Sequence, residues 1–331
     1  MNNFWKKLTP PILALAPMEG VNDTAFRQIC KQGGADVVYT EFVAADAIVH
    51  DARKTMDRLA FDPSEQPVIA QIFGHNLESF ATAAQKISQL GYAGLDINFG
   101  CPARKVVAHG SGVALFRRPA YARELIQRAL DSVSIPVSIK MRTSIRAERK
   151  ELDPDNPRRI TAVDFLDAIG DLPVAAIMVH GRSYEQGHRG DIDTDMIREV
   201  KQRFKGIVLA NGGMTTPQLA KAMLETTGAD GVGIARGAMG QPWIFQQIRE
   251  FLKTGQAAPL NAERVTSMVK EHADVVYRAK GDHGLIEFRK HLSKYITNWP
   301  GAAAWRAKAV RITSMADVEE VIAAIKSGLQ P

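Results

Sequence analysis

Cysteine is scarce in this chain, whose 331 residues include only Cys30 and Cys101. Two thiols so far apart have none of the spacing of a metal site, and they fit a reducing compartment. The chain also lacks any apolar run near the roughly 18 residues of a membrane helix. Its first residues lack the apolar stretch and cleavage site of a signal peptide. We therefore expect a cytoplasmic protein with no membrane segment.

Several enzyme motifs are missing as well. There is no Gly-x-Ser-x-Gly elbow of a serine hydrolase, no P-loop, and no Gly-x-Gly-x-x-Gly after the first predicted strand. These absences disfavour a hydrolase or a nucleotidase. The histidines show no His-x-x-x-His spacing and no carboxylate pairing of the kind that predicts a metal site, so we expect no bound metal ion.

Positive charge is present in excess and is concentrated near the C-terminus. The chain has a formal net charge of +6, and residues 278–311 alone carry eight Lys or Arg against two acids. Such clustering favours a polyanionic partner such as nucleic acid. The alternative is a solvated face of helices that pack on the rest of the protein.

Apolar, β-branched runs alternate with helical patterns along most of the chain. Eight strands are predicted, at residues 12–18, 37–43, 67–74, 94–100, 136–142, 175–181, 206–213 and 231–237. Helices are predicted between most of them, for example at residues 79–90, 120–133, 161–169, 193–204 and 216–227. This alternation predicts an α/β protein with a (β/α)8 TIM barrel, and the missing dinucleotide motif disfavours a doubly wound sheet.

A different pattern begins near residue 257 and contains no predicted strand. Helices are predicted there at residues 261–280, 285–299, 302–312 and 315–329. We therefore expect a catalytic barrel domain at residues 1–250, followed by a small C-terminal helical bundle domain at residues 257–331. The charged segment 144–159, after the fifth strand, is predicted to be a loop on the active-site face.

Polar side chains end nearly all the predicted strands, where a TIM barrel places its active site. They are Glu19, Glu41, Gln71, Asn98 with Cys101, Lys140 with Arg142, His180 with Arg182, Asn211 and Arg236. Cys101 is a candidate acid or nucleophile, and a small buried hydrophobe is the alternative. Cys30 recurs with Phe26 and Ile29 at helical spacing and is predicted to lie in the core.

The last two predicted strands end in the glycine-rich sequences Asn211-Gly212-Gly213 and Ala235-Arg236-Gly237. Glycine lets backbone N–H groups approach an anion, and the guanidinium of Arg236 can donate two hydrogen bonds to it. The two glycine-rich sequences together therefore predict a phosphate site. Simple tight turns are the alternative.

Lys140 and His180 each allow more than one role. Lys140 could stabilise negative charge on a bound ligand, form a Schiff base, or lie at the rim of the barrel. His180 could donate to the same ligand or serve as a structural residue.

Seven motifs follow the predicted strands in order. They are Ala16-Pro17-Met18, Gln71-Ile72-Phe73-Gly74, Asp96-Ile97-Asn98-Phe99-Gly100-Cys101-Pro102, Ile139-Lys140-Met141-Arg142, Val179-His180-Gly181-Arg182, Ala210-Asn211-Gly212-Gly213, and Arg236-Gly237-Ala238 with Pro242-Trp243-Ile244-Phe245. As an ordered set they resemble the bacterial tRNA-dihydrouridine synthase family, and Arg289-Lys290-His291 extends the likeness into the helical tail. After Thr143 the chain departs from the family's usual Gly-Trp.

The resemblance implies an FMN-dependent oxidoreductase that reduces a uridine of tRNA to 5,6-dihydrouridine, with NADPH as the transient reductant. The FMN ligands that it implies are Ala16, Pro17, Met18, Gln71, Lys140 and His180 for the ring, and Asn211, Gly212, Gly213, Ala235 and Arg236 for the phosphate. The substrate ligands that it implies are Asn98, Arg142, Arg289, Lys290 and His291.

The implied chemistry assigns a role to Cys101. Hydride passes from reduced FMN to C6 of the uracil ring, and Cys101 donates a proton to C5 as general acid, for which a neutral thiol is suited. The base must leave the RNA fold to reach the flavin, and the basic tail would offset that cost by binding phosphates. We expect tRNA as the partner and a monomeric enzyme.

Two other interpretations remain open. An FMN barrel that reduces a small substrate, such as a dihydropyrimidine dehydrogenase or an ene-reductase, explains the barrel but not the basic tail. A non-enzymatic RNA-binding protein explains the tail but not the intact set of Cys101, Lys140 and Arg236.

Overall fold

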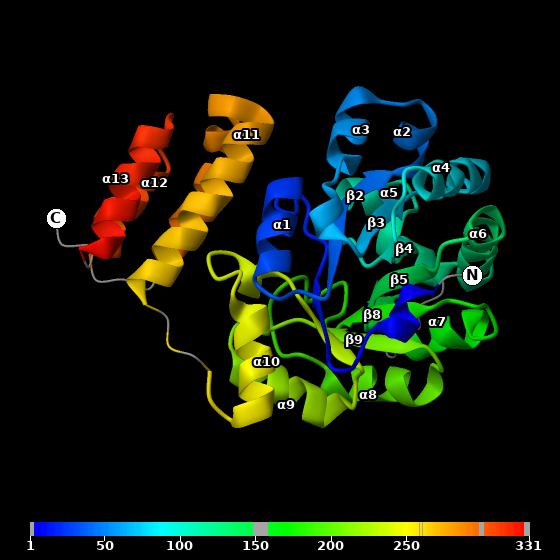
Figure 1. Ribbon diagram of the computed structural model, residues 1–331. Helices are drawn as coiled ribbons and strands as arrows, with labels where there is room; N and C mark the ends of the chain where they lie inside the picture. Colours follow the sequence, from blue (N-terminus) through cyan, green and yellow to red (C-terminus); the bar gives the residue numbers. More distant parts are fainter. Residues whose placement is uncertain (1–2, 148–157, 258, 260, 298–300, 328–331) are drawn as a thin grey trace.

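Eight parallel strands close into a barrel in the computed structural model, which describes residues 3–147, 158–257, 259, 261–297 and 301–327 (Figure 1). The strands are β1 (Ile12–Leu15), β2 (Val37–Ala44), β3 (Val68–Phe73), β4 (Gly94–Phe99), β5 (Val137–Arg142), β8 (Ala176–His180), β9 (Ile207–Asn211) and β10 (Gly231–Ile234). Their order around the barrel is β1-β10-β9-β8-β5-β4-β3-β2. The predicted TIM barrel is confirmed.

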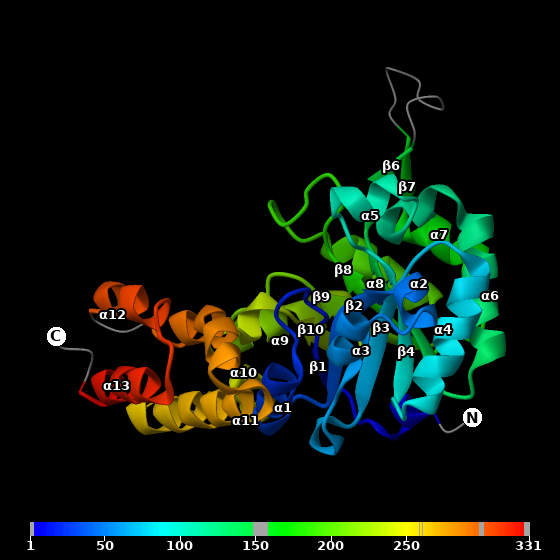
Figure 2. The same ribbon diagram turned by 90° about the horizontal axis from the view of Figure 1, so that it is seen from above.

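Helices follow the strands and cover the outside of the barrel (Figures 1 and 2). They are α1 (Thr24–Gln32), α2 (Ala45–Val49), α3 (Arg53–Leu59), α4 (Leu77–Gln89), α5 (Arg104–Ala108), α6 (Pro119–Ser132), α7 (Ala162–Ile169), α8 (Thr194–Arg203), α9 (Pro217–Thr227) and α10 (Ile244–Thr254). The side chains of Asp23, Asn76 and Thr216 cap α1, α4 and α9 by accepting from backbone N–H groups of the first turn. The five helices predicted between strands agree with α4, α6, α7, α8 and α9 to within two residues at each end.

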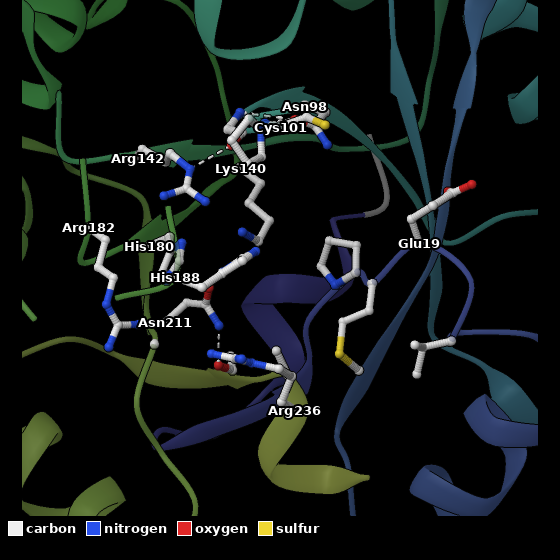
Figure 3. Close-up of a pocket in the computed structure, with 18 of the residues that line it drawn as sticks. Glu19, Asn98, Cys101, Lys140, Arg142, His180, Arg182, His188, Asn211 and Arg236 are labelled. Atoms are coloured by element: carbon white, nitrogen blue, oxygen red, sulfur yellow. Dashed lines mark hydrogen bonds between the residues drawn. The ribbon is translucent and has the colours of Figure 1, made fainter. Parts of the chain in front are cut away.

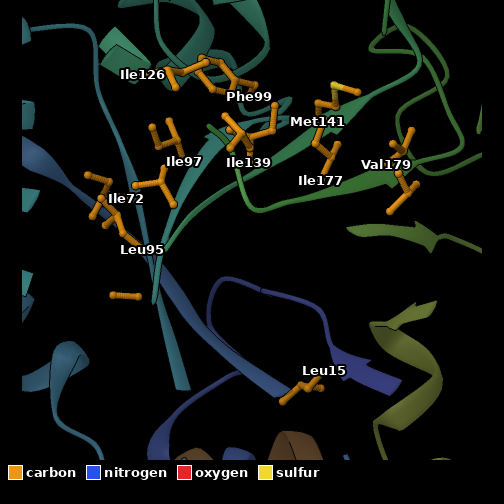
Figure 4. Close-up of a cluster of buried hydrophobic side chains, with 14 of the residues drawn as sticks. Leu15, Ile72, Leu95, Ile97, Phe99, Ile126, Ile139, Met141, Ile177 and Val179 are labelled. Atoms are coloured by element: carbon orange, nitrogen blue, oxygen red, sulfur yellow. The ribbon is translucent and has the colours of Figure 1, made fainter. Parts of the chain in front are cut away.

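The alternation of side chains along each strand separates the core from the functional residues. Leu95, Ile97 and Phe99 of β4 are fully buried in the layer between the sheet and the helices (Figure 4). Asp96 and Asn98 therefore point into the barrel, because successive strand residues face opposite sides. The same alternation in β5 buries Ile139 and Met141 under the helices and turns Ser138 and Lys140 inward.

The helical tail consists of α11 (Ala262–Tyr295), α12 (Ala302–Ala309) and α13 (Met315–Lys326). The break predicted between helices 261–280 and 285–299 is confirmed, because α11 consists of two helical parts that meet at a kink at Gly281 (φ 58°, ψ −149°). That backbone conformation favours glycine, because a Cβ atom disfavours positive φ.

The tail packs on α1 and α10 at one side of the barrel (Figure 2). A second hydrophobic core joins Val269, Phe288 and Leu292 of α11 to Ala25 and Trp243 of the barrel. The two parts therefore share an apolar interface.

The charged segment after β5 is only partly a loop. Its ends form an antiparallel pair, β6 (Ser144–Arg146) with β7 (Arg159–Thr161), which corrects the prediction at those positions. Residues 148–157, the middle of the predicted loop, lie outside the described residues. Within the described ranges, none of the helices is both long and apolar enough to span a bilayer.

Candidate active site

A cavity of about 730 Å³ opens at the C-terminal ends of the barrel strands (Figure 3). Thirteen of the predicted site residues line it: Pro17, Met18, Gln71, Asn98, Cys101, Lys140, Arg142, His180, Asn211, Gly212, Gly213, Ala235 and Arg236. Parallel register brings them together, because Asn98 is paired with Lys140, and His180 with both Arg142 and Asn211. The volume is within the range of small-molecule and cofactor sites.

A chain of hydrogen bonds runs from the barrel interior to the Cys101 loop. The Asp96 carboxylate accepts from Ser138 Oγ at 2.6 Å and from Gln71 Nε2 at 2.7 Å. Gln71 Oε1 accepts from Asn98 Nδ2 at 2.9 Å, and Asn98 Oδ1 accepts from the backbone N–H of Cys101 at 2.8 Å. The position of the loop is therefore linked to a buried carboxylate.

Burial raises the pKa of Asp96 to about 6. The hydrogen bonds from Ser138 and Gln71 and the charge of Lys140 act in the opposite direction, because each favours the carboxylate. Burial is the larger effect, so Asp96 titrates well above an ordinary aspartate.

Cys101 lines the cavity and is 7% exposed. Burial, assisted by the negative charge of Glu19, raises its pKa, while Arg142, Lys140 and a hydrogen bond from the backbone of Ala103 oppose the change. The thiol is therefore neutral at pH 7, the form that can donate a proton.

Arg142 holds the Cys101 loop against the loop after β8. Its Nε donates to the Gly100 carbonyl at 2.8 Å, and its Nη1 donates to the carbonyls of Ser183 and Gly187 at 2.9 and 2.8 Å. The guanidinium lines the cavity, but much of its hydrogen-bonding capacity serves the protein backbone.

One wall of the cavity is strongly basic, with Glu19 on the opposite side (Figure 3). Burial, together with the charge of Arg142, lowers the pKa of Lys140 to about 8. Burial and the neighbouring cations also hold the pKa of His180 far below its usual value, so its ring is neutral. A ligand with negative charge or several acceptor atoms suits this wall.

The two glycine-rich loops follow neighbouring strands, β9 and β10, and Asn211 Nδ2 at the end of β9 donates to the Gly233 carbonyl of β10 at 2.6 Å. Gly212 has φ +116°, and a Cβ there would lie 2.8 Å from Ile192 Cδ1 and 2.9 Å from the His180 ring. A side chain at Gly212 would therefore be strained and crowded. After β10 the chain forms a short 3₁₀ turn, Arg236–Ala238, rather than an α-helix.

Four predicted site residues do not line this cavity. Ala16 is fully buried, and its backbone N–H donates to the Ile234 carbonyl at 2.8 Å. Lys290 lies outside the cavity, although its charge acts on the Glu41 carboxyl.

Two side chains of the tail that were predicted to contact the substrate, Arg289 and His291, have partners within the protein. The Arg289 guanidinium donates to the Ile312 carbonyl at 2.6 Å, where it satisfies the chain after α12. His291 is 1% exposed and packs 4.6 Å from the Phe26 ring. Both side chains serve the interior of the tail or its interface with the barrel.

Some residues that line the cavity escaped prediction, including Phe42, His188 and Met239. The His188 ring lies 6.0 Å from that of His180, yet it comes from a loop well beyond the end of β8. No local sequence pattern distinguishes His188 from other loop residues, because it reaches the barrel mouth only through the path of the folded loop. Cys30, by contrast, is fully buried in the core as predicted.

Comparison with known proteins identifies close sequence relatives. Residues 14–329 match the protein family described as "Dihydrouridine synthase (Dus)". The tRNA-dihydrouridine synthase B of Pseudomonas aeruginosa is 36% identical over 307 residues, which cover 92% of this chain and 89% of that protein. The probable tRNA-dihydrouridine synthase 1 of Synechocystis sp. is 34% identical over 310 residues, covering 93% and 84%.

Solved structures are similar at a greater distance. A morphinone reductase variant in complex with tetrahydroNAD aligns with a TM-score of 0.52 at 13% identity, covering 78% of this chain and 91% of that one. The 6-hydroxypseudooxynicotine amine oxidase of Pseudomonas geniculata N1 aligns with a TM-score of 0.55 at 13% identity, covering 80% and 51%. The present chain thus spans about half the length of the amine oxidase, and at such identity the likeness shows the fold alone.

The sequence relatives are more informative than these folds, because identity above 30% extends over nearly the whole chain, barrel and tail together. The chain belongs to the dihydrouridine synthase family.

Proposed function

We propose that this protein is an FMN-dependent tRNA-dihydrouridine synthase, which reduces a uridine of tRNA to 5,6-dihydrouridine with NADPH as the electron source. The observation that carries the proposal is the neutral thiol of Cys101 in the same cavity as Lys140, Gly212 and Arg236. Family membership and the names of the sequence relatives support it. We propose a cytoplasmic monomer.

The cavity fits a flavin mononucleotide. Gln71 and Lys140 offer hydrogen-bond donors to the polar edge of the ring, and Met18 offers an apolar surface. Gly212 has no side chain, so its backbone can lie close to a phosphate. Arg236 lines the same cavity and has a guanidinium that can bind the phosphate. When bound, reduced FMN supplies the hydride equivalent that adds to C6 of the uracil ring.

Cys101 supplies the proton in this proposal. The S–H bond breaks as a C–H bond forms at C5 of the uracil, and the resulting thiolate regains its proton from water. Arg142 and Lys140 favour the thiolate electrostatically, so they reduce the cost of the transfer. Asn98 holds the Cys101 backbone and positions the thiol.

The helical domain, residues 257–331, would bind the tRNA while the barrel, residues 1–250, reduces the base. Lys290 keeps its predicted contact with the RNA, and Arg278 and Lys294, two further basic residues of α11, would also bind phosphates. A uracil base must be extruded from the RNA to enter the cavity, which costs about a few kcal/mol and is offset by such contacts.

The decisive experiment supplies the purified protein with FMN and NADPH and offers it either unmodified tRNA or free uridine. Dihydrouridine, measured by mass spectrometry of digested tRNA, should form in tRNA and not from the nucleoside. Equal turnover of free uridine or orotate would instead favour a small-substrate reductase. A colourless protein that takes up no FMN would refute the proposal.

A further inference from the structure

Three ligating side chains from distant parts of the chain meet between the barrel and the tail. Asp23 caps the start of α1, and His272 and His291 project from α11. One ligand atom from each lies within 4.8 Å of the others. The cluster lies outside the residues that line the active-site cavity.

The surroundings of the two histidines are almost entirely apolar. His272 is 0% exposed and His291 is 1% exposed. The Phe26 ring lies 5.9 Å from the His272 ring and 4.6 Å from the His291 ring, and the Phe288 ring lies 4.7 Å from His272. Water has little access to such a site.

Three ring nitrogens in this enclosure have no hydrogen-bond partner among the described residues. They are Nε2 of His272 and both ring nitrogens of His291, none of which has a hydrogen bond of good geometry. The His291 ring has a weak hydrogen bond to the Val21 backbone carbonyl, which leaves its other ring nitrogen free. A buried polar group without a partner is destabilising, so native proteins rarely leave one unsatisfied.

We propose that Asp23, His272 and His291 bind one divalent transition-metal ion of the Zn²⁺ class, which ties α11 to the barrel. Two imidazole nitrogens and one carboxylate oxygen form an established donor set for zinc. Tyr295 completes the arrangement, because its hydroxyl lies 3.1 Å from His272 Nδ1. If Nδ1–H donates to the Tyr295 hydroxyl, the lone pair of His272 lies on Nε2, which has no hydrogen-bond partner among the described residues.

The surrounding groups make this assignment testable. Bonds of about 2.0–2.1 Å place tetrahedral ligand atoms about 3.4 Å apart, so binding requires the three side chains to draw closer. Asp23 accepts one hydrogen bond from Phe26 N as a helix cap, and its Oδ2 lies 3.9 Å from Lys280 Nζ. The ion would replace Lys280 as the counter-charge of the carboxylate.

No linear motif could reveal the site, because its ligands stand at positions 23, 272 and 291 and meet only when the tail docks. The expectation of a metal-free protein rested on spacing along the chain. This inference does not depend on the proposed enzymatic function, since the ion lies at a packing interface.

The test begins with the wild-type protein, stripped by a chelator and titrated with Co²⁺ and with Zn²⁺. We expect one equivalent of cobalt with the visible absorption of a low-coordinate site, displaced by Zn²⁺, and a melting temperature that rises with zinc. His272→Asn and His291→Asn should each lower zinc affinity at least tenfold. Asp23→Asn should weaken it as well, while the side-chain cap of α1 is kept.

Two histidine variants serve as matched controls. His283 is exposed on the same helix, and His188 lies beside His180 in the active-site cavity, so H283N and H188N should bind the ion as the wild type does. Failure of the wild-type protein to bind cobalt or zinc stoichiometrically would overturn the proposal without reference to any variant. Loss of binding in H188N with retention in H291N would also overturn it, because the ion would then belong to the barrel cavity.

Discussion

Gln71 donates to the buried carboxylate of Asp96 at 2.7 Å, and this bond sets the orientation of the active-site amides. A carboxylate can only accept, so the NH2 of Gln71 must face Asp96 and its oxygen must face Asn98. Asn98 is then obliged to donate to Gln71 and to present its own oxygen to the backbone N–H of Cys101. A residue beneath the cavity thereby determines which groups a ligand meets.

Asp96→Asn should weaken FMN binding. An amide at position 96 can donate as well as accept, so Gln71 can turn over and lose its fixed orientation. A hydrogen bond to a charged group contributes about 1.5–3 kcal/mol, which predicts a loss of tenfold or more in affinity, measured by quenching of flavin fluorescence. Ser138→Ala, which removes the other partner of Asp96, is the control and should have a smaller effect. Unchanged affinity in D96N would show that Gln71 needs no such anchor.

Asp96 should also make stability depend on pH. Its pKa is about 6 in the folded protein against about 3.9 for an unfolded aspartate, so the native state binds more protons between these values. The protonated carboxyl therefore contributes to the free energy of unfolding below about pH 4. This contribution, about 2–3 kcal/mol at most, is lost as pH rises toward 6. Urea unfolding of the flavin-free protein should show this slope, and D96N should lack it. Parallel pH profiles for the two proteins would contradict the prediction.

Cys101→Ala should separate the two halves of the reaction. We expect normal FMN binding and normal reduction of the flavin by NADPH, because the thiol takes part in neither. Reoxidation of the reduced enzyme by tRNA, followed by stopped-flow absorbance without oxygen, should slow by about 10²–10⁴-fold, the usual contribution of a general acid. Cys101→Ser, whose hydroxyl is a much weaker acid, should behave similarly. Reoxidation of C101A at the wild-type rate would assign the proton to another donor.

Lys140 should lose its proton at unusually low pH in the flavin-free protein. With a pKa of about 8, the amine becomes nucleophilic as pH rises through that value. Competitive acetylation read by mass spectrometry should give a reactivity midpoint near pH 8, with the exposed Lys294 as the reference lysine in the same sample. FMN should protect Lys140 and leave Lys294 unaffected. Labelling of Lys140 that FMN does not reduce would place it outside the flavin site.

Alanine substitutions at the neighbouring residues Lys290 and Arg289 of the tail should have different effects. Lys290→Ala should weaken tRNA binding with little change in melting temperature. The slope of the logarithm of the binding constant against the logarithm of salt concentration should become shallower by about one unit. Arg289→Ala should lower the melting temperature, because the Ile312 carbonyl loses its hydrogen-bond donor. Fluorescence anisotropy at several salt concentrations and thermal melts distinguish the two. Equal effects of both changes on RNA affinity would show that Arg289 also meets the substrate.

Much of the barrel and its site could be predicted from local patterns. Leu95, Ile97 and Phe99 alternate with Asp96 and Asn98, and a strand with this alternation can bury its apolar face only by turning its polar face inward. Since eight parallel strands end on one face, a polar residue at each end is placed near the others by topology alone. The same topology predicts that the Cys101 thiol lies at the barrel mouth.

The sequence by itself thus determined the strands, most helices and the residues around the barrel mouth, because these follow from periodicity and chain direction. Only the tertiary structure decided that His291 is buried, that Arg289 donates to the Ile312 carbonyl, that Ala16 lies outside the cavity, and that Asp23 meets His272. These outcomes depend on how one helix docks on another. Docking is set by shape and burial between residues far apart in the chain, which no local pattern records.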